Sequence, residues 1–207
     1  MLIQGQVGQP GVTSLGPGTN PTLRVGQMGD AIVSELHGRY YETTYRRNLF
    51  TAYSGGTAMS VAGTALIGLQ LWNASNSVNL VLSKCTGFVA VTSASTTGIL
   101  LASGIGQVTT PTSLTAITRA SNNFIGGGLP QGQAYNAGTF SIAPTPFWPL
   151  LHNTAAIATV GEDQGWQMDF EGSVIVPPQA YVAIVALGSA AAAAAVYCSL
   201  MWEEVPI

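Results

Sequence analysis

The chain has 207 residues and only 15 formal charges, six basic and nine acidic, so that 7% of its residues are charged. Soluble domains usually carry about 25%. The hydrophobic content of 47% excludes a disordered chain, which lacks apolar residues and carries a high net charge. The net charge of -3 excludes the strongly basic surface of a dedicated nucleic-acid-binding protein. A surface so poor in charge suits a subunit that neighbouring molecules cover.

The charges divide the chain into two regions. Seven of the 15 lie between Arg24 and Arg47, whereas Arg119 is the one charge between Thr86 and Gly161. We therefore expect an extended N-terminal arm over residues 1–50 and a compact β domain over 51–207. The first 22 residues are rich in Gly, Pro, Gln and Thr and cannot bury enough apolar surface to order themselves, so they are either mobile or laid onto a partner. Residues 30–37 resemble a short strand.

The end of the arm carries the candidate partner-binding residues. Arginine and tyrosine are enriched at protein interfaces, and this segment combines them at Arg39, Tyr40, Tyr41, Arg46 and Arg47. The alternative is a solvated turn whose rings pack on the domain's own surface. Phosphate contacts with nucleic acid are disfavoured, because residues 1–50 sum to only +1. The small difference in net charge between the arm and the rest of the chain favours docking onto a protein surface instead.

From residue 51 onward, short strand patterns alternate with turn residues. Val, Ile and Thr dominate these segments, as strands prefer. Residues 103–150 are richer in Gly, Pro and Thr and indicate long loops with short strands. Eight to ten short strands predict an all-β fold, a jelly-roll-like β-sandwich. The expected strands with the clearest patterns cover 65–72, 78–83, 87–93, 98–102, 166–170, 172–176, 181–185 and 196–200.

The segment 172–202 contains no charged residue and is long enough to span a bilayer. Pro177-Pro178 and the β-branched and aromatic residues around it favour two strands joined by an Ala-rich turn instead, so no membrane partner is expected. The start of the chain lacks the basic and apolar regions of a secretory signal. Cys85 and Cys198 lie in apolar stretches without zinc-ligand spacing, which favours buried thiols and leaves a disulfide between them open.

No motif indicates catalysis or a cofactor. His37 and His152 lie outside nucleophile and metal signatures, so no catalytic residue and no metal site is assigned. Asp169 and Glu171 share a face of a strand over 166–171, which leaves an acid pair or a structural cation near Asp163 and Asp169 as open alternatives. The scattered aromatics favour core packing over a sugar platform; they are Trp72, Phe124, Tyr135, Phe147, Trp148, Trp166 and Trp202.

Several segments resemble small jelly-roll virion proteins of tailed bacteriophages. VIVPPQAYV at 174–182 and SLMWEEVP at 199–206 are similar to their closing strands. LQLWN at 69–73 leading into VNLVL at 78–82 is similar to their early core hairpin, and LHGRYYE at 36–42 to their arm. The resemblance covers about half of the chain. It implies a head decoration (cement) protein, typically a trimer, or a fibre attached to the head or tail.

The resulting expectation is a non-enzymatic structural protein on the outer surface of a phage capsid. Its partners would be the major capsid protein and further copies of itself, most simply in a homotrimer, with the arm laid over neighbouring subunits. The alternative is the receptor- or glycan-binding head of a tail fibre or spike, using loops in 103–150 with Tyr135, Phe147 and Trp148. An enzyme such as a glycan depolymerase is the weakest hypothesis, because it needs an acid pair in a cleft.

Overall fold

The computed structural model describes residues 39–57, 59–60, 62–89, 98–116, 121–152, 164–187 and 196–207, with the short pieces 5–6 and 23–24. Its contacts divide the chain into two compact units, Met1–Arg39 and Tyr40–Ile207. In the first unit, β1 (Gly5–Gln6) pairs in parallel with β2 (Leu23–Arg24). The predicted strand at 30–37 and most of the predicted arm lie outside the described residues. Residues 40–50, which the sequence assigns to the arm, belong to the second unit.

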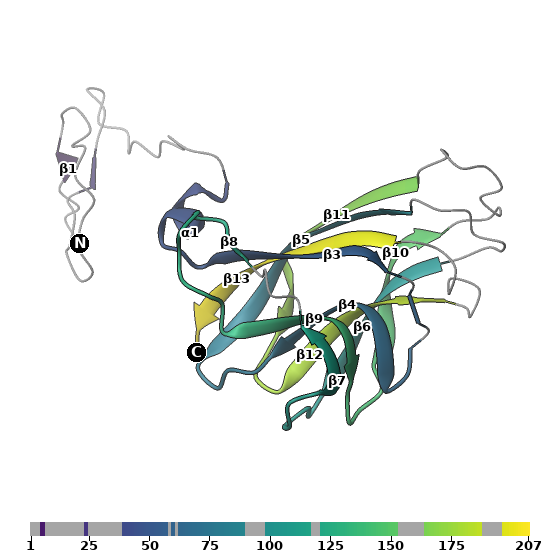
Figure 1. Ribbon diagram of the computed structural model, residues 1–207. Helices are drawn as coiled ribbons and strands as arrows, with labels where there is room; N and C mark the ends of the chain where they lie inside the picture. The colour runs from purple at the N-terminus through teal and green to yellow at the C-terminus, as the bar shows by residue number, and fades with distance from the viewer. Residues whose placement is uncertain are drawn as a thin grey trace. The chain divides into compact units, whose positions relative to one another are not determined.

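The second unit consists of two antiparallel sheets, shown one above the other in Figure 1. This confirms the prediction of an all-β sandwich; α1 (Tyr41–Tyr45) is the one helix among the described residues. The five-stranded sheet has the order β11 (Gln164–Val176), β5 (Val78–Val89), β13 (Val196–Pro206), β3 (Leu49–Thr57) and β8 (Ser121–Asn122). The six-stranded sheet has the order β10 (Thr145–His152), β6 (Gly98–Ile105), β12 (Ala180–Ala186), β4 (Ala65–Asn73), β9 (Gly132–Thr139) and β7 (Thr112–Ala116).

Consecutive strands of the chain often lie in different sheets. β4 and β5 are joined by only four residues, yet β4 pairs with β9 and β12 while β5 pairs with β11 and β13. The hairpin expected over 69–82 is therefore wrong, because the turn at 74–77 crosses from one layer to the other. The buried Asn73 holds this crossing: its amide donates to the carbonyls of Val78 (2.8 Å) and Val176 (2.9 Å).

Two pairs of expected strands are single long strands interrupted by bulges. The segments 78–83 and 87–93 merge into β5 up to Val89, and 166–170 and 172–176 merge into β11. Both neighbours of β5 change register beside Ser83. In β11, four residues from Phe170 to Ser173 stand between the pairs Asp169–Lys84 and Val174–Leu82. Such bulges keep the apolar side chains of both halves directed into the core.

The main core lies between the two sheets. Alternate side chains of β13 are buried, and Cys198, Leu200 and Trp202 are among them. Every residue of β12 is buried, so side chains on both faces of this central strand are covered. The strands predicted at 181–185 and 196–200 are confirmed by β12 and β13. In the described part of the chain, no helix is long and apolar enough to cross a membrane.

A second cluster covers the outer face of the six-stranded sheet. Tyr181 of β12 is stacked on Phe140 with ring centroids 4.0 Å apart, and its hydroxyl donates to the carbonyl of Ile142. The buried Gln107 ties two loops together, since its side-chain oxygen accepts hydrogen bonds from the backbone and hydroxyl of Ser141. Loops therefore close part of this face. The region 103–150 also contains β9 and β10, each eight residues long, so it is richer in strand than expected.

Candidate binding surfaces

The predicted partner-binding residues surround α1 at the start of the second unit. Tyr41 and Tyr45 lie one turn apart with stacked rings, 6.0 Å between centroids, and are 45% and 50% exposed. Arg46 and Arg47 follow directly and are exposed. Burial raises the pKa of Glu203 while the neighbouring charge of Arg46 lowers it. The structure thus places Tyr41 in α1 and Tyr40, Arg46 and Arg47 in the turns that flank it, with Arg39 at the end of the first unit.

Arg47 ends the turn in a left-handed backbone conformation with φ of 64°. Such a conformation is unfavourable for a residue with a Cβ, and two contacts hold it. The Asn122 amide donates to the Arg47 carbonyl at 2.7 Å. The Arg47 guanidinium lies 4.9 Å from the centroid of the Phe124 ring. The predicted docking residue Arg47 therefore also fixes the chain direction into β3.

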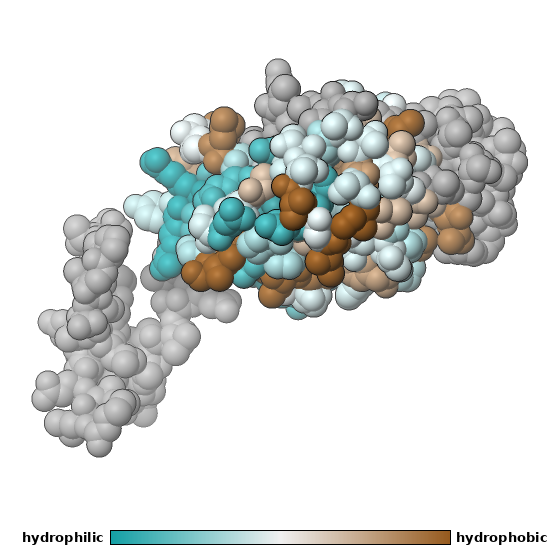
Figure 2. All heavy atoms as spheres, turned by 90° about the horizontal axis from the view of Figure 1, so that it is seen from below, coloured by the Kyte–Doolittle hydropathy of each residue, from teal (hydrophilic) through white to brown (hydrophobic). Residues whose placement is uncertain are grey.

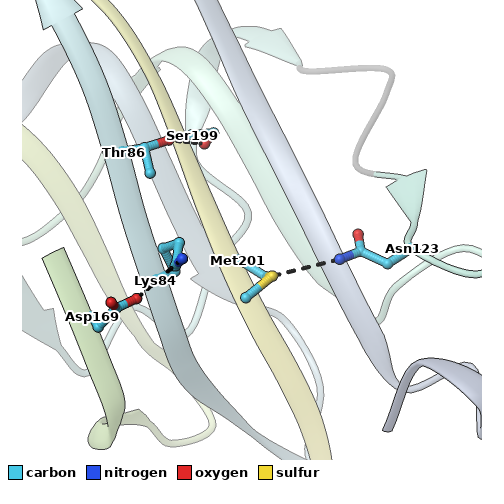
Figure 3. A network of polar contacts seen from close by, with 6 residues as sticks. All are labelled: Lys84, Thr86, Asn123, Asp169, Ser199 and Met201. Carbon is cyan, nitrogen blue, oxygen red and sulfur yellow. Dashed lines mark hydrogen bonds and ion pairs between the residues drawn. The ribbon is translucent and has the colours of Figure 1, made fainter. Parts of the chain in front are cut away.

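The outer face of the five-stranded sheet carries side chains in rows across β11, β5, β13 and β3. One row contains Thr86 and Ser199, whose hydroxyls are 2.7 Å apart. The next row contains the ion pair between Lys84 and Asp169 (3.3 Å) and the contact of the Asn123 amide with the Met201 sulfur (3.5 Å). Figure 3 shows both rows, with Asn123 directly after the end of β8. The opposite charges of Lys84 and Asp169 are thus matched within this face.

Beside the Thr86–Ser199 row stands a series of aromatic rings. Phe88 and Tyr197 are nearly parallel, with centroids 4.8 Å apart and an angle of 6°. Tyr197 also stacks on Tyr53, at 6.4 Å and 29°. Phe88 is 40% and Tyr53 is 53% exposed. We name the open hollow of about 490 Å³ on this face the ring trough; its lining consists of Tyr53, Thr86, Gly87, Phe88, Gly165, Trp166, Gln167, Tyr197, Cys198 and Ser199.

An apolar groove lies where the edge strands β10 and β11 of the two sheets approach each other. It has a volume of about 380 Å³, and Ile105, Phe147 and Ile175 on its lining are 74%, 45% and 56% exposed. The edge strand β10 contains Pro146 and Pro149. Proline supplies no backbone N–H, so this edge cannot be extended by a regular partner strand. On the β10 side of the groove, a partner therefore binds through side-chain contacts.

The three aromatics in 103–150 that the alternative glycan-binding head would use differ in their exposure. Tyr135 is buried, Trp148 is packed against the main core, and only Phe147 of the three is well exposed. The prediction of core packing is confirmed for Trp72, Trp166 and Trp202, each less than 9% exposed. No local sequence motif marks Tyr53, Phe88 and Tyr197 as a group. The strand register identifies them, because it places the three aromatic rings side by side on adjacent strands.

The remaining candidate residues are dispersed. The acid pair of Asp169 and Glu171 is separated by the bulge in β11, where Glu171 has a φ of 53°. Asp163, His37 and the His152 side chain lie outside the described part of the chain. Among the residues described, no group of three or more His, Cys, Asp or Glu side chains is placed to hold a metal ion.

The two cysteines are free and buried on adjacent strands of the five-stranded sheet, as expected for buried thiols. Burial raises the pKa of Cys85 to about 12 and raises that of Cys198. A raised pKa favours the protonated thiol, which is a weaker nucleophile than the thiolate.

Comparisons with known proteins give no relative for this chain. No protein-family model matches it, and neither a curated protein nor a solved structure does.

Proposed function

We propose that the chain is a non-enzymatic structural subunit of a bacteriophage virion, a decoration protein that binds the major capsid protein on the outer surface of the shell. The proposal rests on the kind of side chain that is exposed at the surface of the second unit. Large apolar side chains are exposed on strands of both sheets, in a chain with 7% charged residues. Figure 2 shows brown apolar spots among pale neutral and teal hydrophilic side chains on one face. Such a surface favours coverage by neighbouring subunits.

We also propose that the sandwich is a jelly roll. Eight strands pair as in a long hairpin that has been rolled up: β3 with β13, β4 with β12, β5 with β11, and β6 with β10. The pairs alternate between the two sheets, which supports a jelly-roll topology. β7, β8 and β9 lie between β6 and β10 in the chain and extend the sheets at the far edge. Jelly rolls serve many functions, so this topology alone assigns none.

In this proposal the subunit forms a homotrimer through the apolar groove between β10 and β11. The partner in the groove is a second copy, because three exposed apolar side chains surround it and the prolines of β10 disfavour strand addition at that edge. The turn around α1, with Tyr41 and Arg46, contacts the shell, and the arm lies over neighbouring subunits. Many weak contacts of this kind bind a lattice strongly when they act together.

Two measurements test the proposal. Light scattering of the purified protein should give three times the chain mass of 21.3 kDa, and Ile105→Ser with Ile175→Ser should yield monomers that keep their strand content. Electron microscopy of particles with and without the protein should show added density on the head lattice. The matched control is Ile125→Ser, since Ile125 is 89% exposed but lies outside the groove. A stable monomer that does not bind its capsid would overturn the proposal.

A further inference from the structure

We infer that the ring trough binds an uncharged carbohydrate, with one sugar ring stacked on Phe88. This inference does not depend on the capsid proposal, because it rests on the shape and chemistry of one sheet face. The trough lies on the outer face of the five-stranded sheet, and its lining side chains come from β3, β5, β11 and β13.

In the described part of the chain, one face of the Phe88 ring has no stacking partner. Its other face is covered by Tyr197 on β13, and the free face is directed toward β11 on the opposite side of β5. There its register partner is Gly165, which has no side chain. A Cβ at Gly165 would lie 3.9 Å from the Phe88 Cβ, so any larger side chain would occupy the space beside the ring. The glycine therefore leaves a slot that admits a flat ligand onto an aromatic face.

Polar groups adjoin this slot. The Thr86 and Ser199 hydroxyls form one hydrogen bond with each other, which leaves one hydroxyl proton and several lone pairs available. The exposed Gln167 amide adds donors and an acceptor from the same strand as Gly165. A sugar presents C–H groups on its ring face and hydroxyls, which both donate and accept, around its edge. A purely apolar ligand would desolvate the hydroxyls without replacing their hydrogen bonds.

The charge of the site restricts the ligand further. Among the described residues, no charged side chain lines the ring trough, and the nearby Lys84 is paired with Asp169. A phosphate or carboxylate would have no cation to balance it here, which disfavours nucleic acids and acidic glycans. The volume of about 490 Å³ lies within the range of small-ligand sites, roughly 300–1,000 Å³. The occupant that fits all these features is a neutral oligosaccharide.

The experiment uses the full chain and a panel of immobilised oligosaccharides. The panel contains neutral glucose, galactose and mannose oligomers, with sialylated and uronic-acid-containing glycans for comparison. We expect binding to one or more neutral oligomers, measured by titration calorimetry with the oligomer in solution. Phe88→Ala and Gly165→Val should each weaken that binding by about tenfold or more, the equivalent of about 1.4 kcal/mol. Tyr45→Ala is the matched control, since Tyr45 is an exposed aromatic residue like Phe88 but lies on α1.

Gly165→Val should fold, because the nearest atom to a Cβ there is 3.6 Å away and valine favours strands. Gln167→Ala offers a second variant at an exposed position. Weaker binding in these variants with an unchanged melting temperature supports the site. Failure of the wild-type protein to bind any neutral oligomer at millimolar concentration overturns the inference, as does equal binding by Phe88→Ala. Dissociation of an oligomer by Phe88→Ala also overturns it, because the face is then an interface between copies.

Discussion

Gly104 in β6 provides a direct test of how tightly the second cluster is packed. It pairs with Tyr181, and a Cβ on Gly104 would lie 2.2 Å from the Cε1 atom of that ring. The ring cannot retreat, because it is buried, stacked on Phe140 and hydrogen-bonded to the carbonyl of Ile142. Gly104→Ala therefore overpacks the cluster, at a cost of about 1–3 kcal/mol in the free energy of unfolding. For a domain of this size the melting temperature falls by about 2–12 °C.

The assay is thermal unfolding followed by circular dichroism. Gly165→Ala is the control, since the same change at an edge strand brings the new Cβ no closer than 3.6 Å to any atom, and we expect its melting temperature to stay near that of the wild type. A double-mutant cycle with Tyr181→Leu isolates the contact, because the cost of Gly104→Ala should shrink when the ring is absent. If Gly104→Ala melts like Gly165→Ala, the packing described for Tyr181 is wrong.

Three further predictions concern other parts of the second unit. Asn122→Ala removes the hydrogen bonds to the Arg47 carbonyl and from the Phe124 N–H and should cost about 1–3 kcal/mol in urea unfolding; an unchanged midpoint would contradict this role. Glu204 accepts hydrogen bonds from the N–H groups of Gln131 and Gly132, and burial raises its pKa above 4.5. Its contribution to stability is therefore complete below pH 4.5 and is lost as pH rises through the folded pKa. Relative to Glu204→Gln, the wild type should lose stability between acidic and neutral pH in urea titrations, and a pH-independent difference would refute this. Cys85 and Cys198 should react with a thiol reagent only after unfolding, because both are buried; rapid labelling of the folded protein would show an opening of the sheet.

The sequence predicts the fold class well because each strand has its own pattern of apolar residues over a short stretch of the chain. The alternation of buried and partly exposed residues in β13 follows the pattern in its sequence. The continuous apolar run of β12 matches a strand covered on both faces. Both signals depend on neighbouring residues along the chain. They can therefore be recognised in the sequence before it is known which strands pair.

Pairing itself depends on non-local contacts and was predicted less well. The short connection 74–77 suggests a hairpin, but the crossing between sheets is fixed by Asn73, which reaches Val176 about a hundred residues away. The break at Ser83 in the alternation of apolar and polar residues predicts the end of a strand. In the structure it is the position where β13 and β11 both change register. A bulge and a turn give similar sequence signals, since only the partner strand distinguishes them.

The ring trough was missed for the same reason. Tyr53, Phe88 and Tyr197 are far apart in the sequence and each has a polar or small neighbour, so none forms a local motif. The sheet brings them together only when β13 stands between β3 and β5. By contrast, the predicted docking residues around α1 all lie within residues 39–47, and the interface-prone composition of that segment is visible without a structure.

The two outer faces of the sandwich differ in a way that bears on function. Loops around Gln107 and Phe140 cover part of the six-stranded sheet and fix Tyr181 beneath them. Substitutions there should change stability first, because the side chains are buried and a ligand cannot reach them. The outer face of the five-stranded sheet retains exposed rings and a matched ion pair instead. Phe88→Ala should thus alter binding more than folding, since Phe88 loses a partly solvated stack rather than a buried one.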